Sequence, residues 1–537
     1  MLKLHGLSLL LQLALTAPAL ASLTSVNESS AEPLRIAFAP HPFLSHWAVS
    51  APIAHELLQR GHKALFVAST EDWCSLRATG LAHHPNVSVA TYQAPYSESR
   101  LRETINGYRG SPLHAVLETF FNIRDFSDAM LTDRRLFCQV QAFDADLLVA
   151  DPGNLGGWAL ADALDIHKAI VQVPGFTPPL DADLYGHGGH SPAFVPTFGS
   201  VLPTRMTLTQ RCQNVGTWAL VMVIWRGFIN WFASYHIWWK HNIAPHSYRE
   251  SGRRSCLVLV NSHFALAPPR PLGPKVHVVG PLTAKSPEPL PADLEAFMQS
   301  AGQFGVVYAS LGYTAIPERH ELQAVADALA AVAPVSVLWK LTAADQQLLG
   351  VGNVTLSHNI RLIEWAPQND VLGHPATRAF LTQAGTNSFN EAAYHGVPIV
   401  GLPLFAEQPD NMARATEQGF GLSVSVDDAL GLAQNLRRAL LQILQNPSFA
   451  ENANRVSRRI RATHWSPASQ AASLIEHAAW TQGDAYLDTP LKNMPWYQQI
   501  LLDVLAVCSA VTAVLAVASL WMYRWCSRHF GKHVKVA

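Results

Sequence analysis

A run of apolar residues near the C-terminus places the strongest constraint on this chain. Residues Val504–Tyr523 include no charged side chain and no histidine. A helix of about 20 residues, at about 1.5 Å per residue, spans roughly 30 Å, which matches the hydrocarbon thickness of a bilayer. Trp521, Tyr523 and Trp525 stand at its far end, where aromatic rings favour the membrane interface. We therefore predict a transmembrane helix over 504–523.

The charged residues beyond this span predict its orientation. Basic side chains follow it at Arg524, Arg528, Lys532 and Lys535. Because basic flanks are retained in the cytosol, the tail 524–537 is predicted to be cytosolic. The body that precedes the span is then lumenal, as in a single-pass type I membrane protein.

Two further signals agree with a lumenal body. Residues 1–21 combine a basic Lys3, an apolar stretch and a small-x-small ending, which is typical of a signal peptide. A buried N-terminal helix is the alternative. Sequons for N-glycosylation occur at Asn27, Asn86 and Asn353.

Length and composition exclude some classes of protein. The chain has 537 residues, which predicts two domains. Its net charge of -1 provides no positive electrostatic potential that would attract a polyanion. We therefore expect no nucleic-acid partner. The six cysteines include no C-x-x-C pair, so neither a zinc site nor a redox motif is indicated.

The body alternates short apolar runs with helical patterns, which predicts parallel α/β architecture. In residues 33–281, an apolar run at Leu34–Pro40 precedes a helical pattern at Ser50–Arg60. After a Pro-rich linker at 283–291, the alternation resumes over 292–482 and is expected to finish with a returning helix. We predict two doubly wound, Rossmann-like domains that face a cleft.

The segment Arg205–Lys240 differs from both domains. It is dense in Trp and other apolar residues, and Arg226 interrupts it. The longest uncharged stretch is too short to span a bilayer comfortably. We expect helices that pack over an apolar pocket or lie against the membrane. A purely buried helical insertion is the alternative.

The stretch FLTQAGTNSFNEAAYHGVP, at 380–398, places polar residues between a predicted strand and a predicted helix. A helix starting near Asn387 would present free N–H groups, which together with the helix dipole favour an anion such as phosphate. Gly385 permits close approach of the backbone, and Asn387 and Ser388 add side-chain donors. Glu391, one turn later, can accept hydrogen bonds from ribose hydroxyls. An ordinary helix cap is the alternative.

Two neighbouring strand ends favour the phosphate interpretation. Trp365 offers a flat indole face for a base, and Gln368 offers an amide. After another strand, Glu407 and Gln408 can bind sugar hydroxyls. Contacts for base, phosphate and sugar are thus predicted at successive strand ends of one sheet.

These residues resemble the signature of the membrane-anchored UDP-glucuronosyl/UDP-glucosyltransferase family. The signature is WAPQNDVLGHPATRAFLTQAGTNSFNEAAYHGVPIVGLPLFAEQPDN. The segments FMQSAGQFGVVYASLG, APPRPLGPKVHVVGPL and PHPFLSHWAVSAPIAHELLQRGH are also similar to that family. The resemblance implies the GT-B fold, with the acceptor site in the N-terminal domain and the UDP-sugar site in the C-terminal domain. It also implies a protein of the endoplasmic reticulum membrane.

The resemblance implies roles for individual residues. Trp365 would stack on uracil, and Ala366 would meet its edge through the main chain. Gln368 and Glu391 would hold the ribose, while Glu407 and Gln408 would bind the transferred sugar. The diphosphate would be held by the residues of two turns, namely Ser310, Gln383, Gly385, Asn387 and Ser388. The family uses no metal, and we expect no cofactor besides the UDP-sugar donor.

The resemblance also implies a general base. His46, in the SHW turn after the first strand, matches the catalytic histidine of the family, and Asp151 matches its carboxylate partner. A neutral imidazole can take the proton of a hydroxyl group. His41 lies nearby in the sequence and is a rival base. The implied reaction is an inverting single displacement, in which the acceptor oxygen attacks the anomeric carbon as UDP leaves.

Some features of the sequence support other interpretations. D-x-D pairs at Asp144–Asp146 and Asp181–Asp183 raise the alternative of a metal site. A non-catalytic nucleotide-sugar or lipophile-binding protein is the rival from a different class. Departures from the family pattern keep it open, since Gln383 replaces the usual His, Ala384 replaces Gly or Cys, and Tyr313 replaces Ser.

The sequence bears on the sugar and the acceptor only indirectly. Family members that use glucuronate tend to carry an Arg where this chain has Val260. Together with Gln383, this favours UDP-glucose, with UDP-glucuronate second. The apolar segment Arg205–Lys240 and the anchor suggest a small lipophilic acceptor such as a sterol, phenol or lipid alcohol. Self-association in the membrane is left open.

Overall fold

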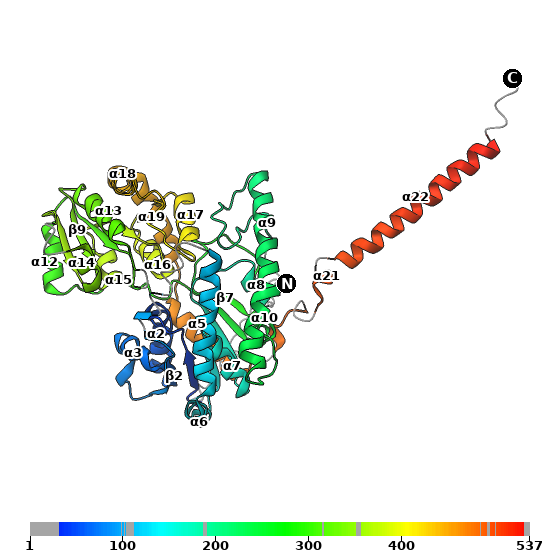
Figure 1. Ribbon diagram of the computed structural model, residues 1–537, viewed down its shortest axis with the longest axis horizontal. Helices are drawn as coiled ribbons and strands as arrows, with labels where there is room; N and C mark the ends of the chain where they lie inside the picture. The colour runs from blue at the N-terminus through cyan, green and yellow to red at the C-terminus, as the bar shows by residue number, and fades with distance from the viewer. Residues whose placement is uncertain are drawn as a thin grey trace, which may run out of the picture.

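Two parallel α/β domains, a long surface helix and a C-terminal helix make up the protein (Figure 1). The computed structural model describes residues 32–97, 99–100, 103, 112–185, 191–313, 316–350, 356–483, 485–490, 494–499 and 501–530. The predicted signal peptide at 1–21, the sequons at Asn27 and Asn353 and the last residues of the basic tail lie outside the described residues.

The N-terminal domain is built on a seven-stranded parallel sheet in the order β3-β2-β1-β4-β5-β6-β7. Its strands are β1 (Arg35–Ala39), β2 (Lys63–Ser69), β3 (Val87–Tyr92), β4 (Leu147–Ala150), β5 (Lys168–Gln172), β6 (Leu257–Val260) and β7 (Val276–Val278). Every residue of β4, β5 and β6 is buried, which requires cover on both faces of the sheet. Ala39 of β1 lies beside Ala150 of β4, so the carboxyl ends of these strands coincide.

Helices cover both faces of this sheet. They are α2 (Leu44–Gln59), α3 (Trp73–Ala78), α5 (Pro112–Thr132), α6 (Arg134–Phe143), α7 (Leu155–Ala163), α8 (Leu180–Tyr185) and α11 (Tyr248–Arg253), with short 3-10 turns η1 (Thr70–Asp72) and η2 (Leu81–His83). One apolar core packs residues of α5 and α7 against the sheet, and a second packs α2 against the other face.

Helix α2 begins earlier than the sequence predicted. It starts at Leu44 instead of Ser50, because Phe43 already has the extended conformation of an N-cap residue. Trp47 and Val49 are fully buried and fix this first turn on the core. His46 therefore lies in the first turn of a helix, where its backbone is held by helical geometry rather than by a loop.

The C-terminal domain contains a six-stranded parallel sheet in the order β10-β9-β8-β11-β12-β13. Its strands are β8 (Val306–Ser310), β9 (Ser336–Lys340), β10 (Ile360–Ile363), β11 (Thr377–Thr382), β12 (Ile399–Gly401) and β13 (Gly421–Ser423). Its helices are α12 (Ala292–Ser300), α13 (Arg319–Ala330), α14 (Ala343–Leu349), α15 (Gln368–Gly373), α16 (Thr386–His395), α17 (Gln408–Glu417), α18 (Leu432–Gln445) and α19 (Pro447–Arg461). Two apolar cores, one on each face, hold these helices to the sheet.

Helix α20 (Pro467–Trp480) returns to the N-terminal domain. Ala471, Ala472 and Ile475 are fully buried and belong to the core that also contains α2. The last helix of the C-terminal half thus packs on the first sheet, so the two domains are joined by a packed helix as well as by the linker.

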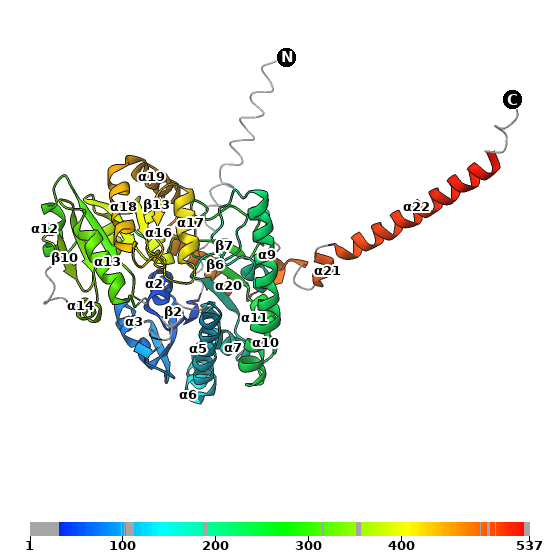
Figure 2. The ribbon, with the colours of Figure 1, turned by 45° about the horizontal axis from the view of Figure 1, so that its top comes forward.

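A long helical run lies on the surface of the N-terminal domain (Figure 2). It consists of α9 (Leu208–Ile224), η4 (Trp225–Ile229), α10 (Asn230–Ala233) and η5 (Ser234–Trp239), where η4 and η5 are π-helical. In the most apolar 18-residue stretch of this run, only 22% is buried in the protein. The alternative of a purely buried insertion is therefore wrong for these residues.

The C-terminal segment leaves the body as η6 (Ala485–Leu487), α21 (Trp496–Gln499) and α22 (Leu502–Phe530). The most apolar part of α22 has a mean hydropathy of 2.3 and none of it is buried in the protein. Its length and composition fit a transmembrane helix, and the predicted span 504–523 lies within it.

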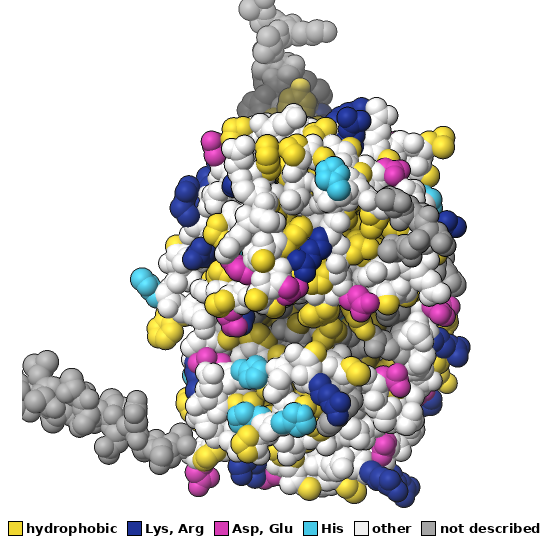
Figure 3. Space-filling model, turned by 90° about the vertical axis from the view of Figure 1, so that its left-hand side faces the viewer, with side chains coloured by type: hydrophobic (Ala, Val, Ile, Leu, Met, Phe, Trp, Pro, Cys, Tyr) yellow, Lys and Arg dark blue, Asp and Glu magenta, His cyan; other side chains and the backbone are white. Residues whose placement is uncertain are grey.

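The two domains face each other across a hollow. Figure 3 shows it between the upper and lower parts of that face, with hydrophobic side chains at its bottom. Several hydrogen bonds join the domains. Nδ2 of Asn390 donates to the main-chain oxygen of Asn261 at 3.3 Å, and the backbone N–H groups of Gly199 and Val201 donate to the carboxylate of Asp410 at 2.7 and 3.0 Å.

Glu476 fastens α20 to the N-terminal domain, and its loss should weaken that contact. Its carboxylate accepts a hydrogen bond from Arg60 at 2.7 Å and lies 2.8 Å from Nε2 of His62. In Glu476→Ala both partners lose a mostly buried carboxylate, which should lower the free energy of unfolding by about 3 kcal/mol. We expect the apparent Tm of the full chain in detergent, followed by circular dichroism, to fall by several degrees.

A matched control for this variant is Glu56→Ala. Glu56 also pairs with Arg60, at 2.8 Å, but within helix α2. It should lower the apparent Tm by less, because it leaves the α20 contact in place. Equal losses in the two variants would contradict the assigned role of Glu476.

Candidate active site

A histidine and an aspartate meet at the carboxyl edge of the first sheet. Nδ1 of His46 lies 2.6 Å from Oδ2 of Asp151, and the carboxylate accepts a hydrogen bond from this nitrogen. Asp151 is 2% exposed, whereas the His46 side chain is 24% exposed and can reach a substrate. The N–H of Gly153 donates to Oδ1 of Asp151 at 2.7 Å and fixes the carboxylate. Nε2 of His46 is then the ring nitrogen that can face an acceptor hydroxyl.

The electrostatic surroundings favour His46 over His41 as a base. Burial disfavours the charged imidazole of His46, but the carboxylates of Asp151 and Glu407 outweigh it and raise its pKa above the ordinary value of 6.5. Burial, together with the nearby His46, lowers the pKa of His41 to about 3. Nδ1 of His41 is buried and has no hydrogen-bond partner among the described residues. His41 is a very weak proton acceptor.

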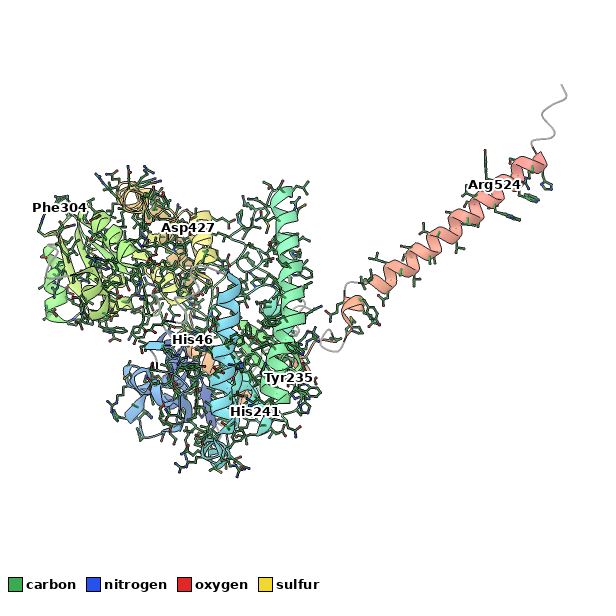
Figure 4. All side chains as sticks on the ribbon, in the orientation of Figure 1. His46, Tyr235, His241, Phe304, Asp427 and Arg524 are labelled. Carbon is green, nitrogen blue, oxygen red and sulfur yellow. The ribbon has the colours of Figure 1, made fainter. Side chains whose placement is uncertain are left out.

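The polar turn after β11 lies directly opposite His46. Nδ2 of Asn387, in the first turn of α16, donates to the main-chain oxygen of Ser45 at 2.9 Å, across the two domains. Figure 4 shows His46 where the upper and lower domains meet. Nε2 of Gln368 donates to Oγ of Ser388 at 3.1 Å and to Oε2 of Glu391 at 2.8 Å. Gln368, Ser388 and Glu391 are thus joined by hydrogen bonds, and Asn387 of the same helix α16 lies beside the segment that carries His46.

Glu391 is buried in this group. Its burial raises its pKa to about 7, even though Gln368 donates a hydrogen bond that favours the carboxylate. A ribose hydroxyl, as a further donor, would stabilise the ionised form. Glu391 follows Asn387 by one turn of α16, and its contact with ribose stays a prediction.

Gln383 lies between two glycine turns. A Cβ at Gly312 would come within 2.1 Å of its Nε2, so the amide lies against the turn after β8. Gly312 has φ +82, a conformation that favours glycine. Oε1 of Gln383 accepts a hydrogen bond from the hydroxyl of Thr382 at 3.1 Å. The side chain therefore joins the β8 and β11 turns, and Ser310, in the first of them, is 1% exposed.

The residues predicted to bind the sugar are engaged with the protein. Oε1 of Glu407 accepts hydrogen bonds from the N–H and the hydroxyl of Thr386, both at 3.1 Å. Oε1 of Gln408 accepts the backbone N–H groups of Leu404 and Phe405. Gln408 therefore shapes the loop that carries Glu407, and a sugar would meet the remaining atoms of these two side chains.

The predicted base site lies at the outer edge of the same sheet. Trp365 is 57% exposed, so its ring is accessible to a base. The Nζ of Lys340 lies 4.8 Å from the centre of the indole, in a cation–π contact. Ala366 is buried and belongs to the core beneath it. Stacking of uracil on Trp365 and a main-chain contact at Ala366 stay predictions.

Comparison with known proteins decides the family. The family described as UDP-glucoronosyl and UDP-glucosyl transferase matches residues 38–536. The chain belongs to this family. UDP-glucuronosyltransferase 2A2 of Homo sapiens is 32% identical over 513 residues, which cover 91% of this chain and 91% of the relative. UDP-glucuronosyltransferase 2C1 of Oryctolagus cuniculus is 32% identical over 505 residues, which cover 88% of this chain and 95% of the relative.

Solved structures define the fold of this UDP-glycosyltransferase. A UDP-glucosyltransferase from Polygonum tinctorium matches it with a TM-score of 0.59 at 19% identity, covering 85% of this chain and 100% of that chain. At this identity the likeness establishes the fold alone, which is GT-B as predicted. The protein is a membrane-anchored UDP-glycosyltransferase with two Rossmann-like domains.

Sequence reasoning missed several residues of the site. Thr386 joins Glu407 to the start of α16, and Asn261 donates to Val173 and accepts from Leu282 at the end of β6. Lys340 stacks on Trp365 from the neighbouring strand β9. Thr386 follows Gly385 at the predicted helix start, which is a usable signal. The contacts of Asn261 and Lys340 join distant segments and carry no local signal.

The two D-x-D pairs have structural partners. Asp144 pairs with Arg35 at 2.7 Å, and Asp183 pairs with Arg226 and Arg249, both at 2.7 Å. Asp146 and Asp181 accept backbone N–H groups. These contacts account for the carboxylates and place neither pair in the group around Asn387.

The pH dependence of the UDP-glycosyltransferase should report His46. A base must be neutral, so kcat/KM should rise with pH through the raised pKa of His46 and then level off. In Asp151→Asn the carboxylate that raises this pKa is lost, so the inflection should move to lower pH. The value of kcat should fall about 10²- to 10⁴-fold. Steady-state kinetics of the full chain at a series of pH values measures both.

Asp146→Asn is the matched control, since Asp146 lies before β4 and Asp151 follows it. Its profile should match that of the wild type. An unchanged inflection in Asp151→Asn would contradict the assigned pair.

Loss of the imidazole should separate chemistry from donor binding. We expect His46→Ala to abolish turnover while UDP still binds, because the predicted UDP contacts all lie in the C-terminal domain. Calorimetric titration with UDP and an assay for UDP release test the two properties. Full activity in this variant would exclude His46 as the base.

Proposed function

We propose that this UDP-glycosyltransferase carries out an inverting, metal-independent transfer of a hexose from a UDP-sugar to a hydroxyl of a small lipophilic acceptor. The observation that carries the proposal is the hydrogen bond from Asn387 to Ser45, next to the His46–Asp151 pair. It brings the start of α16, suited to a diphosphate, within one residue of the proposed base.

The proposed reaction proceeds in a single displacement. Nε2 of His46 takes the acceptor proton as the acceptor oxygen bonds to the anomeric carbon and the bond to the UDP oxygen breaks. Asp151 stabilises the resulting imidazolium, and attack from the opposite face inverts the anomeric carbon. The N–H groups and dipole at the start of α16 stabilise the negative charge on departing UDP.

UDP-glucose is the proposed donor, with UDP-glucuronate second. Val260 is buried at the end of β6 and supplies no cation where glucuronate users tend to place one. Gln383 is neutral and lies against Gly312. The names of the relatives 2A2 and 2C1 speak for glucuronate, so a donor panel with detection of products by mass spectrometry decides between the two sugars.

A small lipophile is the proposed acceptor class. The apolar helical run α9–η5 of the N-terminal domain and the apolar helix α22 support this class, because a lipophile dissolves in the membrane that such helices favour. A sterol, phenol or lipid alcohol would present its hydroxyl to Nε2 of His46. We further propose that the body is lumenal and that the membrane is the endoplasmic reticulum.

The departures at Gln383 and Tyr313 had kept open the alternative of a non-catalytic binding protein of the same fold, and membership of the transferase family speaks against it. One observable tests turnover directly. A transferase releases free UDP only when acceptor is present, whereas a binding protein releases none across a broad acceptor panel.

Replacing the unusual glutamine tests the donor proposal. We expect Gln383→His to shift kcat or the preference between UDP-glucose and UDP-glucuronate without lowering the apparent Tm, because an imidazole can carry a proton beside the diphosphate and an amide cannot. Gln383→Asn is the matched control that keeps a neutral amide. If kinetic constants and donor profile stay at wild-type values in Gln383→His, Gln383 has no part in donor choice.

A further inference from the structure

One face of the long surface helix exposes large apolar side chains in a continuous row. At intervals of three or four residues, successive turns of α9–η5 present them to the outside, and we call them the apolar ridge. Its members are Leu220, Ile224, Phe228, Trp231, Tyr235 and Trp239, which are 40% to 64% exposed. Soluble surfaces rarely carry a contiguous row of this kind without a partner.

The opposite face of the same helix is buried in the N-terminal domain. Trp225, Ile229, Ile237 and Trp238 belong to the core on which α5 and α7 pack. Although this helix is long and apolar enough to cross a membrane, its attachment to the core prevents it from doing so. It can only lie with its outer face against an apolar environment.

The distribution of charge fits a lipid surface. Between Arg211 and Lys240, Arg226 is the only formally charged residue of the helix. Its guanidinium is held by Asp183 at 2.7 Å, which draws the charge toward the body and away from the ridge. Arg211 stands near the start of the helix, where it can meet lipid headgroups, and Lys240, at the other end, pairs with Asp128 of α5.

The aromatic members of the ridge also suit a bilayer interface. Trp231 and Tyr235 stack with ring centres 6.0 Å apart, and Phe228 lies 6.3 Å from Trp231. Trp and Tyr combine an apolar ring with a polar atom, which is why they favour the headgroup boundary. A packed aromatic row of this type is suited to shallow insertion.

The ridge lies on the side from which the membrane anchor leaves. In Figures 1 and 2, α9 and α10 form the edge of the body that faces α21 and α22. Figure 4 places Tyr235 on that edge and Phe304 at the far side of the molecule. Nζ of Lys275 donates to Asp488 at 3.0 Å. This bond fastens the segment that leads to α21 and α22 onto the N-terminal domain. Between Asp488 and Leu502 the extended chain spans at most about 50 Å.

We propose that the apolar ridge lies in the interface of the leaflet from which α22 enters the membrane. The enzyme then holds its bilayer at two places, by the transmembrane helix and by this shallow contact of the N-terminal domain. The proposal does not depend on the donor or acceptor assigned above, and it concerns lipid and not a second copy of the chain.

Photochemical labelling of the full-length protein tests this contact. The protein is placed in phosphatidylcholine nanodiscs whose acyl chains carry a diazirine near the headgroup, irradiated and mapped by mass spectrometry. Lipid adducts are expected on 215–239 as well as on α22. Peptides with Phe304 or Leu430, which are exposed apolar residues of the C-terminal domain, should remain unlabelled. Adducts confined to α22 would overturn the proposal.

Substitutions within the ridge sharpen the test. Leu220→Lys with Trp231→Lys should lower lipid adducts on 215–239 by roughly fivefold, because a charge at the interface opposes insertion. The adducts on α22 and the affinity for UDP should stay unchanged. Phe304→Lys is the matched control and should leave all adducts at wild-type levels. If the doubly substituted protein fails to fold, the labelling of the unsubstituted protein still tests the proposal.

Self-association is the rival outcome, and the same samples detect it. If a second copy covers the ridge, chemical cross-linking will join 215–239 of two chains, and mass photometry will show a dimer that the ridge substitutions dissociate. Either result, without lipid adducts on 215–239, would assign the face to protein contact and overturn the proposal.

Discussion

The coincidence of two strand ends is the constraint on which the site depends. β1 and β4 are neighbours in a parallel sheet, with Ala39 beside Ala150, so the segments that follow them begin at the same place. His46 follows one strand and Asp151 the other, which brings their side chains within 2.6 Å. A shift of one residue would move every side chain of a strand to the opposite face and disrupt the packing of both cores, so the register of β1 and β4 is fixed.

The contact between domains places the second half of the site. Asn387 reaches Ser45 from the start of α16, and Glu407 acts on the same histidine through its charge. The pKa of His46 therefore depends on carboxylates from both domains. A change in the separation of the domains would alter the basicity of the histidine as well as the distance to the donor.

The membrane-facing features restrict how this body can be oriented. α22 fits a transmembrane helix, while α9–η5 keeps one face in the core and exposes an aromatic row on the other. Helix α20 and the bond between Lys275 and Asp488 fasten the route to the anchor onto the N-terminal domain. The segment that leads to α22 is therefore attached to the N-terminal domain, which is the domain proposed to bind the acceptor. This arrangement suits an acceptor that dissolves in lipid.

The sequence by itself determined the parallel α/β architecture, the apolar C-terminal helix and the positions of the polar turns that follow the strands. These depend on local patterns, namely apolar runs of strand length, an uncharged run of bilayer length and a glycine-containing turn before a helix. The start of α2 was wrong by several residues, because the helix is fixed by burial of Trp47 against a distant sheet. The family resemblance already paired His46 with Asp151, and only the tertiary structure showed that the two are hydrogen-bonded, that Asn387 contacts Ser45 and that Gln383 lies against Gly312. These contacts join segments separated by about a hundred residues or more in most cases, and nothing in a local pattern specifies which atoms of two such segments will meet.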